Sequence, residues 1–346
     1  MVAARLLEHL RSTVQDPALE YAEPPQRITG GFDTATYSFR LSGAPDPFAA
    51  PLILRLYRPD DDPQRAAFEA TVQNVIAGLG YPAPRVLQCR TETEVLGGAF
   101  LVMERLPGRV MLDSILKPSL FTRWPGILAR EQARLHALDA GRLSEAVTEA
   151  GLDAHLRTPE RWLGEMRSRL ERAALYGLRP AADWLLDNRP PPPERPAICH
   201  GDFHPLNVLM EGDRVSGVVD WAWVTVGDPA FDVGATMALL TQGPVELIPP
   251  LRPLMRTGRA LLTGRYWSAY RRLHAIELGH VRYYEALRCL GFLVEAGERL
   301  LADAGALGQL SKPSAFVAPV VRKSIISRLR KLTGVQLSLP DGPQPQ

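Results

Sequence analysis

The segment 200–207, with the sequence HGDFHPLN, contains polar side chains whose spacing suits phosphoryl transfer. Asp202 follows an apolar stretch, Asn207 comes five residues later, and Asp220 comes thirteen residues after Asn207, within VVDW. A hairpin between the two apolar stretches would bring these side chains together. Phosphoryl transfer requires such a set: one carboxylate that accepts the proton of the attacking hydroxyl, and an amide oxygen and a second carboxylate that hold Mg²⁺.

The same residues resemble a known pair of motifs. HGDFHPLNVLM followed by VVDW is similar to the H-G-D-x-x-x-x-N and hydrophobic-Asp elements of the aminoglycoside phosphotransferase and choline kinase-like family. Its members are small-molecule kinases with a protein-kinase-like fold, and the resemblance covers roughly residues 25–300. It implies that Asp202 is the catalytic carboxylate and that Asn207 and Asp220 are Mg²⁺ ligands.

Two other interpretations of this segment stay open. One is a loop in which the glycine only serves a turn. The other is a metal hydrolase, whose ligands would be His200, Asp202, His204 and Asp220. Pro205 directly after His204 favours a turn over histidine rings that converge on a metal. His200 itself is interpreted as a buried anchor of the loop.

The N-terminal part offers a second test of the resemblance. A kinase-like nucleotide site needs a cation on the third strand of that fold and a helix carboxylate to orient it. No lysine precedes Lys117, so Arg55, in LILRLY, is the candidate cation. Glu69 is the only acid between Pro63 and Leu79, and is therefore its candidate partner. Arginine is always charged and can bind phosphate. Both charges could instead face solvent, and the replacement of the usual lysine motivates an alternative function, a nucleotide-binding pseudokinase with little turnover.

The resemblance implies further nucleotide contacts. GGFDTAT at 30–36 resembles the loop that covers the phosphates, in which Gly31 would allow close approach of backbone N–H groups. FLVMERLPG at 100–108 resembles the hinge between lobes, where the Glu104 carbonyl and the Leu106 N–H would bind the base. Backbone recognition leaves ATP and GTP equally open as donors. No Walker-type phosphate loop occurs in the sequence.

The elements that must position these residues follow from hydrophobic periodicity. Residues 1–14 predict a helix, 34–41 and 51–57 two strands, 63–79 a helix, and the stretches 81–89 and 99–108 two further strands. Most of the remaining chain is helical by the same criterion. We therefore predict an α+β, bilobal, protein-kinase-like fold, with a small β-rich N-lobe and a larger, mainly helical C-lobe.

The predicted division has a nucleotide-binding lobe at 1–106, with 1–14 as an accessory helix. A catalytic and acceptor-binding lobe follows at 107–332, and a disordered tail at 333–346. Three side chains are expected to support the catalytic loop. His136 would be structural, Asp228 would cap a helix, and Asp232 would bind the loop backbone.

The acceptor is predicted to be a small hydroxyl compound, but not a polycation. The segments expected to line its pocket, 142–187 and 240–300, contain thirteen acids against sixteen arginines. A polycation needs several carboxylates to offset its loss of hydration. A neutral or anionic compound, such as a macrolide-like molecule, a sugar or a sugar acid, fits this balance better.

Composition excludes several classes of protein. The 346 residues carry a net charge of only +2, so a dedicated nucleic-acid binder is not expected. No apolar run is long enough to span a membrane, the first residues lack a signal-peptide pattern, and three widely spaced cysteines predict free thiols. The sequence thus predicts a cytoplasmic protein and leaves its oligomeric state open. Residues 321–332 form a basic amphipathic helix, which would either dock on the large lobe or contact a membrane surface.

These observations predict an Mg²⁺-dependent small-molecule kinase that transfers the γ-phosphoryl group of ATP or GTP to a hydroxyl group.

Overall fold

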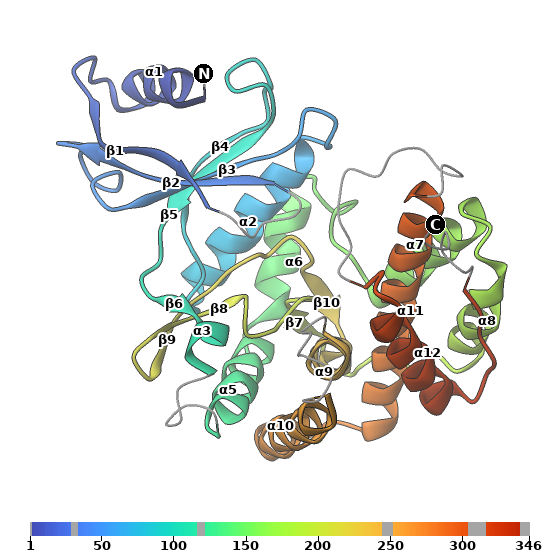
Figure 1. The fold of residues 1–346 in the computed structure, drawn as a ribbon. Coiled ribbons are helices and arrows are strands. Elements are labelled where there is room, and N and C mark those ends of the chain that lie inside the picture. Colours follow the sequence, from blue (N-terminus) through green and yellow to red (C-terminus); the bar gives the residue numbers. More distant parts are fainter. Residues whose placement is uncertain (1, 29–33, 116–121, 244–251, 304–315, 340–346) are drawn as a thin grey trace. The chain divides into compact units, whose positions relative to one another are not determined.

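The computed structural model describes residues 2–28, 34–115, 122–243, 252–303 and 316–339, which belong to two compact units (Figure 1). Unit 1 comprises Met1–Met111, Asp139–Leu156 and Val208–Ala222, and unit 2 comprises the rest. Two stretches beyond residue 106, at 139–156 and 208–222, therefore cluster with the N-terminal residues. Which functions the two parts perform stays a prediction.

Unit 1 contains a five-stranded antiparallel sheet with the strand order β1-β2-β3-β5-β4. The strands are β1 (Glu20–Arg27), β2 (Ala35–Ser42), β3 (Leu52–Leu56), β4 (Val86–Arg90) and β5 (Phe100–Glu104). A second sheet has the order β6-β8-β9, with β6 (Arg109–Val110), β8 (Val208–Glu211) and β9 (Arg214–Val218). The helices are α1 (Val2–Val14), α2 (Gln64–Gly78) and α6 (Ala140–Glu149).

Alternation along β3 directs its side chains to two cores. Leu52 and Leu54 are fully buried and pack in a cluster with residues of α1. Ile53 belongs to the cluster on the opposite face, which includes residues of α2. Because side chains alternate along a strand, Arg55 lies on the same face as Ile53 and Tyr57. That face brings Arg55 to α2.

Strand β1 was not predicted from the sequence, which suggested only four strands in this part. Its residues, EYAEPPQR, are mostly exposed and contain two prolines. Proline lacks a backbone N–H and is tolerated where a strand lies at the edge of a sheet, as β1 does. The pairing with β2 shifts register twice, once between Tyr21 and Glu23 and once between Glu23 and Gln26, where the prolines lie. An edge strand with this composition carries no alternating hydrophobic signal.

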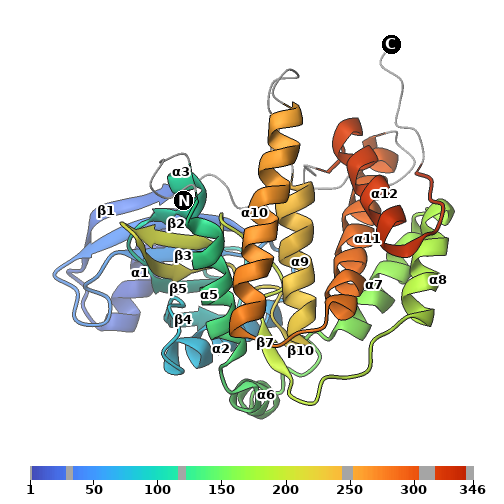
Figure 2. The same ribbon diagram turned by 90° about the horizontal axis from the view of Figure 1, so that it is seen from below.

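Unit 2 is mainly helical, as predicted. Its described helices are α3 (Met111–Ile115), α5 (Trp124–His136), α7 (Pro159–Arg172), the short η1 (Tyr176–Leu178), α8 (Arg179–Asp187), α9 (Pro229–Gln242), α10 (Arg252–Leu273), α11 (Leu278–Asp303) and α12 (Pro319–Thr333). The first residue of α3, Met111, is also the last residue of the first stretch of unit 1. Two short strands, β7 (Ala197–Cys199) and β10 (Thr225–Gly227), pair antiparallel. Figure 2 shows α9 and α10 side by side, with α11 packed between α9 and α12. A sheet-rich N-terminal part followed by a helical part confirms the predicted fold class.

Helix α12 docks within unit 2 instead of presenting an apolar face. Val321, Ile325 and Leu329 are buried, and Arg328 makes a two-pronged ion pair with the buried Glu285 of α11, at 2.7 Å for each bond. Three residues of the apolar stripe of 321–332 are therefore covered, whereas Ile326 and Leu332 are half-buried, so the structure favours docking over a lipid-binding face. Within the described ranges, none of the helices is long and apolar enough to cross a membrane.

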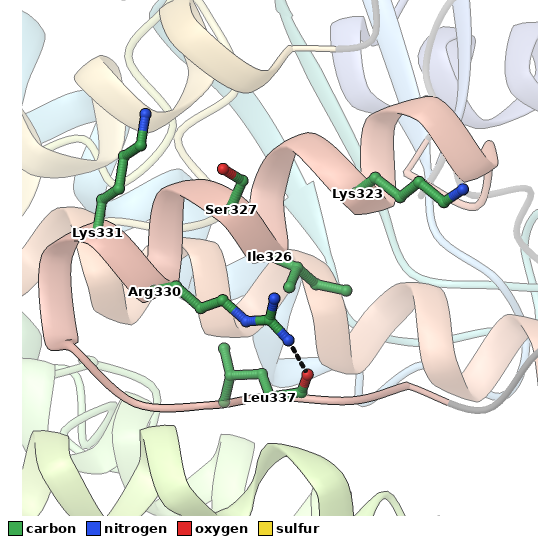
Figure 3. A pocket seen from close by; sticks show the side chains of 6 residues that line it. All are labelled: Lys323, Ile326, Ser327, Arg330, Lys331 and Leu337. Carbon is green, nitrogen blue, oxygen red and sulfur yellow. Dashed lines mark hydrogen bonds between the residues drawn. The ribbon is translucent and has the colours of Figure 1, made fainter.

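The residues after α12 correct a further expectation. The predicted disordered tail from 333 does not hold for residues 334–339, because Leu337 is buried and the Ser338 N–H bonds the Gly177 carbonyl at 3.1 Å. Arg330 also donates to the Leu337 carbonyl at 2.8 Å. Figure 3 shows the shallow pocket that this segment forms with α12; it is lined by Lys323, Ile326, Ser327, Arg330, Lys331 and Leu337. Residues 340–346 lie outside the described residues.

Candidate active site

The loop that carries Asp202 depends on a glycine. Gly201 follows β7 with a φ of +80°, a conformation that side chains other than glycine rarely adopt. A Cβ atom at this position would lie 2.3 Å from the Trp223 carbonyl oxygen. The glycine of the motif therefore serves a turn, and that turn presents Asp202 immediately after the buried strand.

Asp232 binds the backbone of this loop. It lies in the first turn of α9 and is fully buried. Its carboxylate accepts hydrogen bonds from the His200 N–H at 3.0 Å and the Gly201 N–H at 2.8 Å. His136 Nε2 lies 3.0 Å from the same carboxylate. Burial alone would raise the pKa of Asp232, but the contact with His136 lowers it, so the group remains an ionised acceptor.

These contacts confirm the structural expectations for the loop. Asp232 binds the loop backbone, and the Asp228 side chain caps α9 by accepting from the Ala230 N–H at 2.8 Å. His136 is buried between Asp232 and the Tyr270 hydroxyl, 2.6 Å from its Nδ1, which fits a structural role. The sequence did not indicate Tyr270 as its partner.

Asp202 is surrounded by donors. Its Oδ1 accepts from Arg288 Nη2 at 2.6 Å, and its Oδ2 lies 3.2 Å from His204 Nε2. Asn207 donates its side-chain amide to the Asp202 backbone carbonyl at 3.0 Å and lies 3.4 Å from Oδ2. Burial alone would raise the pKa of Asp202, but His204 and then Arg288 outweigh it and hold the pKa well below its usual range. The carboxylate is thus ionised and able to accept a proton from a bound hydroxyl group.

The histidines of this loop have roles other than metal binding. His200 is fully buried, and its Nδ1 accepts from the Asp202 N–H at 3.3 Å, which fits the predicted loop anchor. His204 Nδ1 accepts from the Leu206 N–H at 3.2 Å. Among the described residues, no group of three or more His, Cys, Asp or Glu side chains could hold a metal ion. The nitrogen lone pairs that the hydrolase interpretation requires already accept backbone hydrogen bonds.

Arg55 and Glu69 meet in unit 1, as their positions on β3 and α2 predict. Arg55 Nε lies 3.4 Å from Glu69 Oε1. The Tyr57 hydroxyl donates to Glu69 Oε2 at 2.5 Å, and the Gln73 amide donates to Oε1 at 3.1 Å. The alternative in which both charges face solvent is therefore excluded, because Glu69 is buried and Arg55 largely so.

The third member of this cluster is Asp220. Its Oδ1 accepts from Arg55 Nη2 at 3.0 Å, so one guanidinium joins the two carboxylates. Burial alone would lower the pKa of Arg55, but Glu69 and Asp220 more than offset this and raise it. For Glu69, burial raises the pKa and the charge of Arg55 opposes the rise. Arg55 therefore remains a cation even at this buried position.

Asp220 and Asn207 each carry oxygen donors of the kind that Mg²⁺ prefers. The Asp220 side chain is 39% exposed, in contrast to Glu69, so its carboxylate remains accessible. Its backbone has a φ of +68°, a left-handed conformation that aspartate tolerates better than most residues. Asn207 contributes an amide oxygen. Carboxylate and amide oxygens are the hard donors that Mg²⁺ prefers, so the residues present fit this ion.

The remaining predicted nucleotide contacts are only partly described. Glu104 ends β5 opposite Leu52, and its backbone N–H bonds the Arg85 carbonyl at 3.0 Å. Leu106 lies two residues further and packs against Gly217, where an added Cβ would meet the leucine side chain. Gly31 lies outside the described residues.

Two residues of these clusters were missed by sequence analysis. Tyr57 was placed only on the face of Arg55, although its spacing of two from Arg55 could have identified a second partner for Glu69. Arg288 lies 86 residues after Asp202 in the sequence, within an ordinary helical pattern. No local signal could have assigned it to the catalytic loop.

The β-rich part with its Arg55–Glu69 pair and the helical part with its Asp202 loop define the class of kinase-like phosphotransferases, and comparisons with known proteins agree. The sequence profile of the Phosphotransferase enzyme family matches residues 25–288. A putative aminoglycoside phosphotransferase from Ralstonia eutropha has a similar fold, with a TM-score of 0.68, 19% identity, and 96% of this chain and 98% of that chain covered. The chain belongs to the phosphotransferase enzyme family.

Relatives found by sequence match only part of this chain. Acyl-CoA dehydrogenase family member 11 from Gallus gallus is 30% identical over 175 residues, which is 48% of this chain but only 22% of that protein. The chain thus matches less than a quarter of this relative's length. Aminoglycoside 3'-phosphotransferase from Streptomyces fradiae is 28% identical over 212 residues, which covers 58% of this chain and 75% of that protein.

Proposed function

We propose that the chain transfers the γ-phosphoryl group of ATP or GTP to a hydroxyl group of a small molecule, with Asp202 as the catalytic base. The observation that carries this proposal is the environment of Asp202. It is an ionised carboxylate on a rigid loop, held by Asp232 from the backbone side and contacted by Arg288 and His204 at its oxygens. Such a group can accept the proton of a hydroxyl and aim its oxygen at phosphorus.

Each other residue then has a defined part. Asn207 and Asp220 hold Mg²⁺, which when bound neutralises charge on the phosphates. Arg55, oriented by Glu69, binds phosphate oxygens through its guanidinium group. The Gly31 loop covers the phosphates, and the Glu104 carbonyl and Leu106 N–H bind the base. The proton of the acceptor hydroxyl moves to Asp202, its oxygen bonds to the γ-phosphorus, and the bond from that phosphorus to the diphosphate breaks.

These roles assign a function to each of the two predicted parts of the chain. Residues 1–106 bind nucleotide, and residues 107–332 supply the catalytic loop and the acceptor site. The segments 139–156 and 208–222 pack with the nucleotide-binding part. This assigns Asp220, which lies in the second of them, to the unit that contains Arg55. We further propose that the protein acts in the cytoplasm, since its three cysteines are free thiols.

A combined binding and turnover experiment tests the proposal. Thermal shifts are measured with ATP and GTP, each with and without Mg²⁺, and nucleotide consumption is then followed with a library of hydroxyl compounds. We expect stabilisation by one or both nucleotides that increases with Mg²⁺, and consumption that depends on an acceptor. Nucleotide binding without any turnover would favour the pseudokinase alternative. Stabilisation by Zn²⁺ or Mn²⁺ alone would favour a metal hydrolase.

A further inference from the structure

Arg288 contacts the carboxylate that the proposed mechanism uses as its base. It lies in α11, and its Nη2 is 2.6 Å from Asp202 Oδ1. Only 15% of the Arg288 side chain and 18% of the Asp202 side chain are exposed, so the pair is shielded from solvent. A hydroxyl group that donates its proton to Asp202 must reach one of the carboxylate oxygens, and Arg288 occupies Oδ1.

The surroundings of Arg288 supply little that could replace Asp202. Its guanidinium carbon lies 4.9 Å from the centre of the Phe292 ring and 5.6 Å from that of Trp162. Aromatic faces attract a cation, but they do not neutralise it. Within the described part of the chain, the buried Arg288 Nε has no hydrogen-bond partner. Among the described residues, the Arg288 guanidinium therefore donates to one carboxylate, that of Asp202, while its Nε lacks an acceptor.

The approach of an acceptor changes this balance. When a hydroxyl group bonds Asp202, the contact of Arg288 with that carboxylate weakens. A shielded cation that loses its partner is strongly unfavourable, because its desolvation is no longer compensated. A second carboxylate, carried by the acceptor itself, would restore the same kind of contact in place of the first. Guanidinium groups favour carboxylates bound through two parallel N–H groups. Arg288 donates to Asp202 through Nη2 alone, and an acceptor carboxylate would also offer a partner to its Nε.

We infer that the acceptor is a hydroxy acid, whose carboxylate binds Arg288 while its hydroxyl binds Asp202. This inference rests on the proposed function and names the substrate class for it. Because Arg288 and Asp202 are in direct contact, the two groups of the acceptor lie a few bonds apart. The acceptor carboxylate is unchanged in the reaction: the hydroxyl proton passes to Asp202, the hydroxyl oxygen gains the phosphoryl group, and nucleoside diphosphate leaves. Arg288 is then a specificity residue. A polycationic acceptor would place like charge against it.

The test compares acids with neutral molecules of similar shape. Lactate, 3-hydroxybutyrate and gluconate are each paired with a neutral form: lactamide, methyl 3-hydroxybutyrate and sorbitol. Kanamycin represents a polycation. Transfer is measured as acceptor-dependent nucleotide consumption with Mg²⁺. We expect at least one acid to exceed its neutral partner in kcat/KM by about 10- to 100-fold, the range that a charge-assisted hydrogen bond contributes.

Variants assign that preference to Arg288. Arg288→Gln should remove most of the preference: kcat/KM for the acid should fall about 10- to 100-fold further than kcat/KM for its neutral partner, whatever loss both acceptors share through the altered contact with Asp202. Arg288→Lys keeps the charge and should retain part of the preference. Arg299→Gln is the matched control, because Arg299 lies about three turns further along α11 and pairs with Asp303. It should retain the full preference.

Binding separates this inference from the proposed function. Thermal shifts with acids and neutral partners, measured without nucleotide, report on Arg288 whether or not turnover occurs. Stabilisation by an acid that Arg288→Gln abolishes supports the inference even if no phosphoryl transfer is found. Equal use of neutral or cationic acceptors, or an acid preference that survives in Arg288→Gln, overturns it and leaves the proposed function intact. The absence of any acid-dependent stabilisation and turnover also overturns it.

Discussion

Two buried arginine–carboxylate clusters differ in what they leave available. In unit 1, Glu69 is enclosed and receives hydrogen bonds from Tyr57 and Gln73 as well as the charge of Arg55. In unit 2, Asp202 is less enclosed than Glu69, with 18% of its side chain exposed against 2%, and its contacts with Arg288 and His204 hold it ionised. A saturated carboxylate can only orient its partner, whereas an accessible, ionised one can accept a proton. On the proposed function, the arginine–carboxylate pair positions a phosphate-binding group in unit 1 and takes part in the chemistry in unit 2.

The largest effect is expected from the carboxylate that performs chemistry. Asp202→Asn preserves shape and removes the proton acceptor, so kcat should fall by roughly 10²–10⁴-fold with little change in nucleotide affinity. Steady-state kinetics and nucleotide titration measure the two quantities. Asp183→Asn, an exposed acid on α8, is the control and should be neutral. Near-normal turnover of Asp202→Asn would contradict the mechanism.

The accessible carboxylate of unit 1 should matter for metal more than for stability. Asp220→Ala removes a proposed Mg²⁺ ligand, so the strengthening of nucleotide binding by Mg²⁺ should fall by at least about 10-fold while the fold persists. Nucleotide titrations across Mg²⁺ concentrations test this, with thermal denaturation as the check on folding. The exposed Glu211→Ala at the end of β8 is the control. A normal Mg²⁺ response of Asp220→Ala would show that Asp220 is not a ligand.

The enclosed pair should act as one unit. Arg55→Gln and Glu69→Gln should each weaken triphosphate binding, and the double variant should lose little more than the worse single variant. Contacting residues in one network typically show coupling of about 0.5–3 kcal/mol in such a cycle. The exposed pair of Arg179 and Glu171 in unit 2 provides a control cycle that should have no effect on triphosphate binding. Additive losses for Arg55 and Glu69 would mean that Glu69 does not act through Arg55.

The smallest effect concerns the pH dependence of stability. The pKa of Asp202 is lower in the folded chain than the value of about 3.9 expected when unfolded, so between these values the folded state binds fewer protons. The resulting stabilisation is complete above about pH 3.9 and is lost as pH falls towards the folded value. We expect the wild type to lose more stability in acid than Asp202→Asn does. The difference between their free energies of unfolding should therefore change by an amount on the order of 1 kcal/mol as pH falls. A difference that stays constant from neutral pH into this acidic range would contradict a lowered pKa.

The amino-acid sequence by itself determined the local features of this protein. The Asp228 cap before α9 and the alternation of LILRL depend on interactions between residues close in the chain, and these were predicted correctly. Glu69 could be paired with Arg55 because one helix offered a single acid. Edge strand β1 escaped prediction, since its prolines and exposed residues leave no periodic signal.

Only the tertiary structure decided which distant groups meet. Arg288 contacts Asp202 because α11 packs along α9, and α9 in turn holds the catalytic loop through Asp232. The docking of α12 likewise depends on Glu285 of α11, which pairs with Arg328 and leaves three residues of the apolar stripe covered. Helix packing is governed by whole faces of side chains. The sequence around a single arginine in a helix therefore does not indicate which carboxylate it will contact.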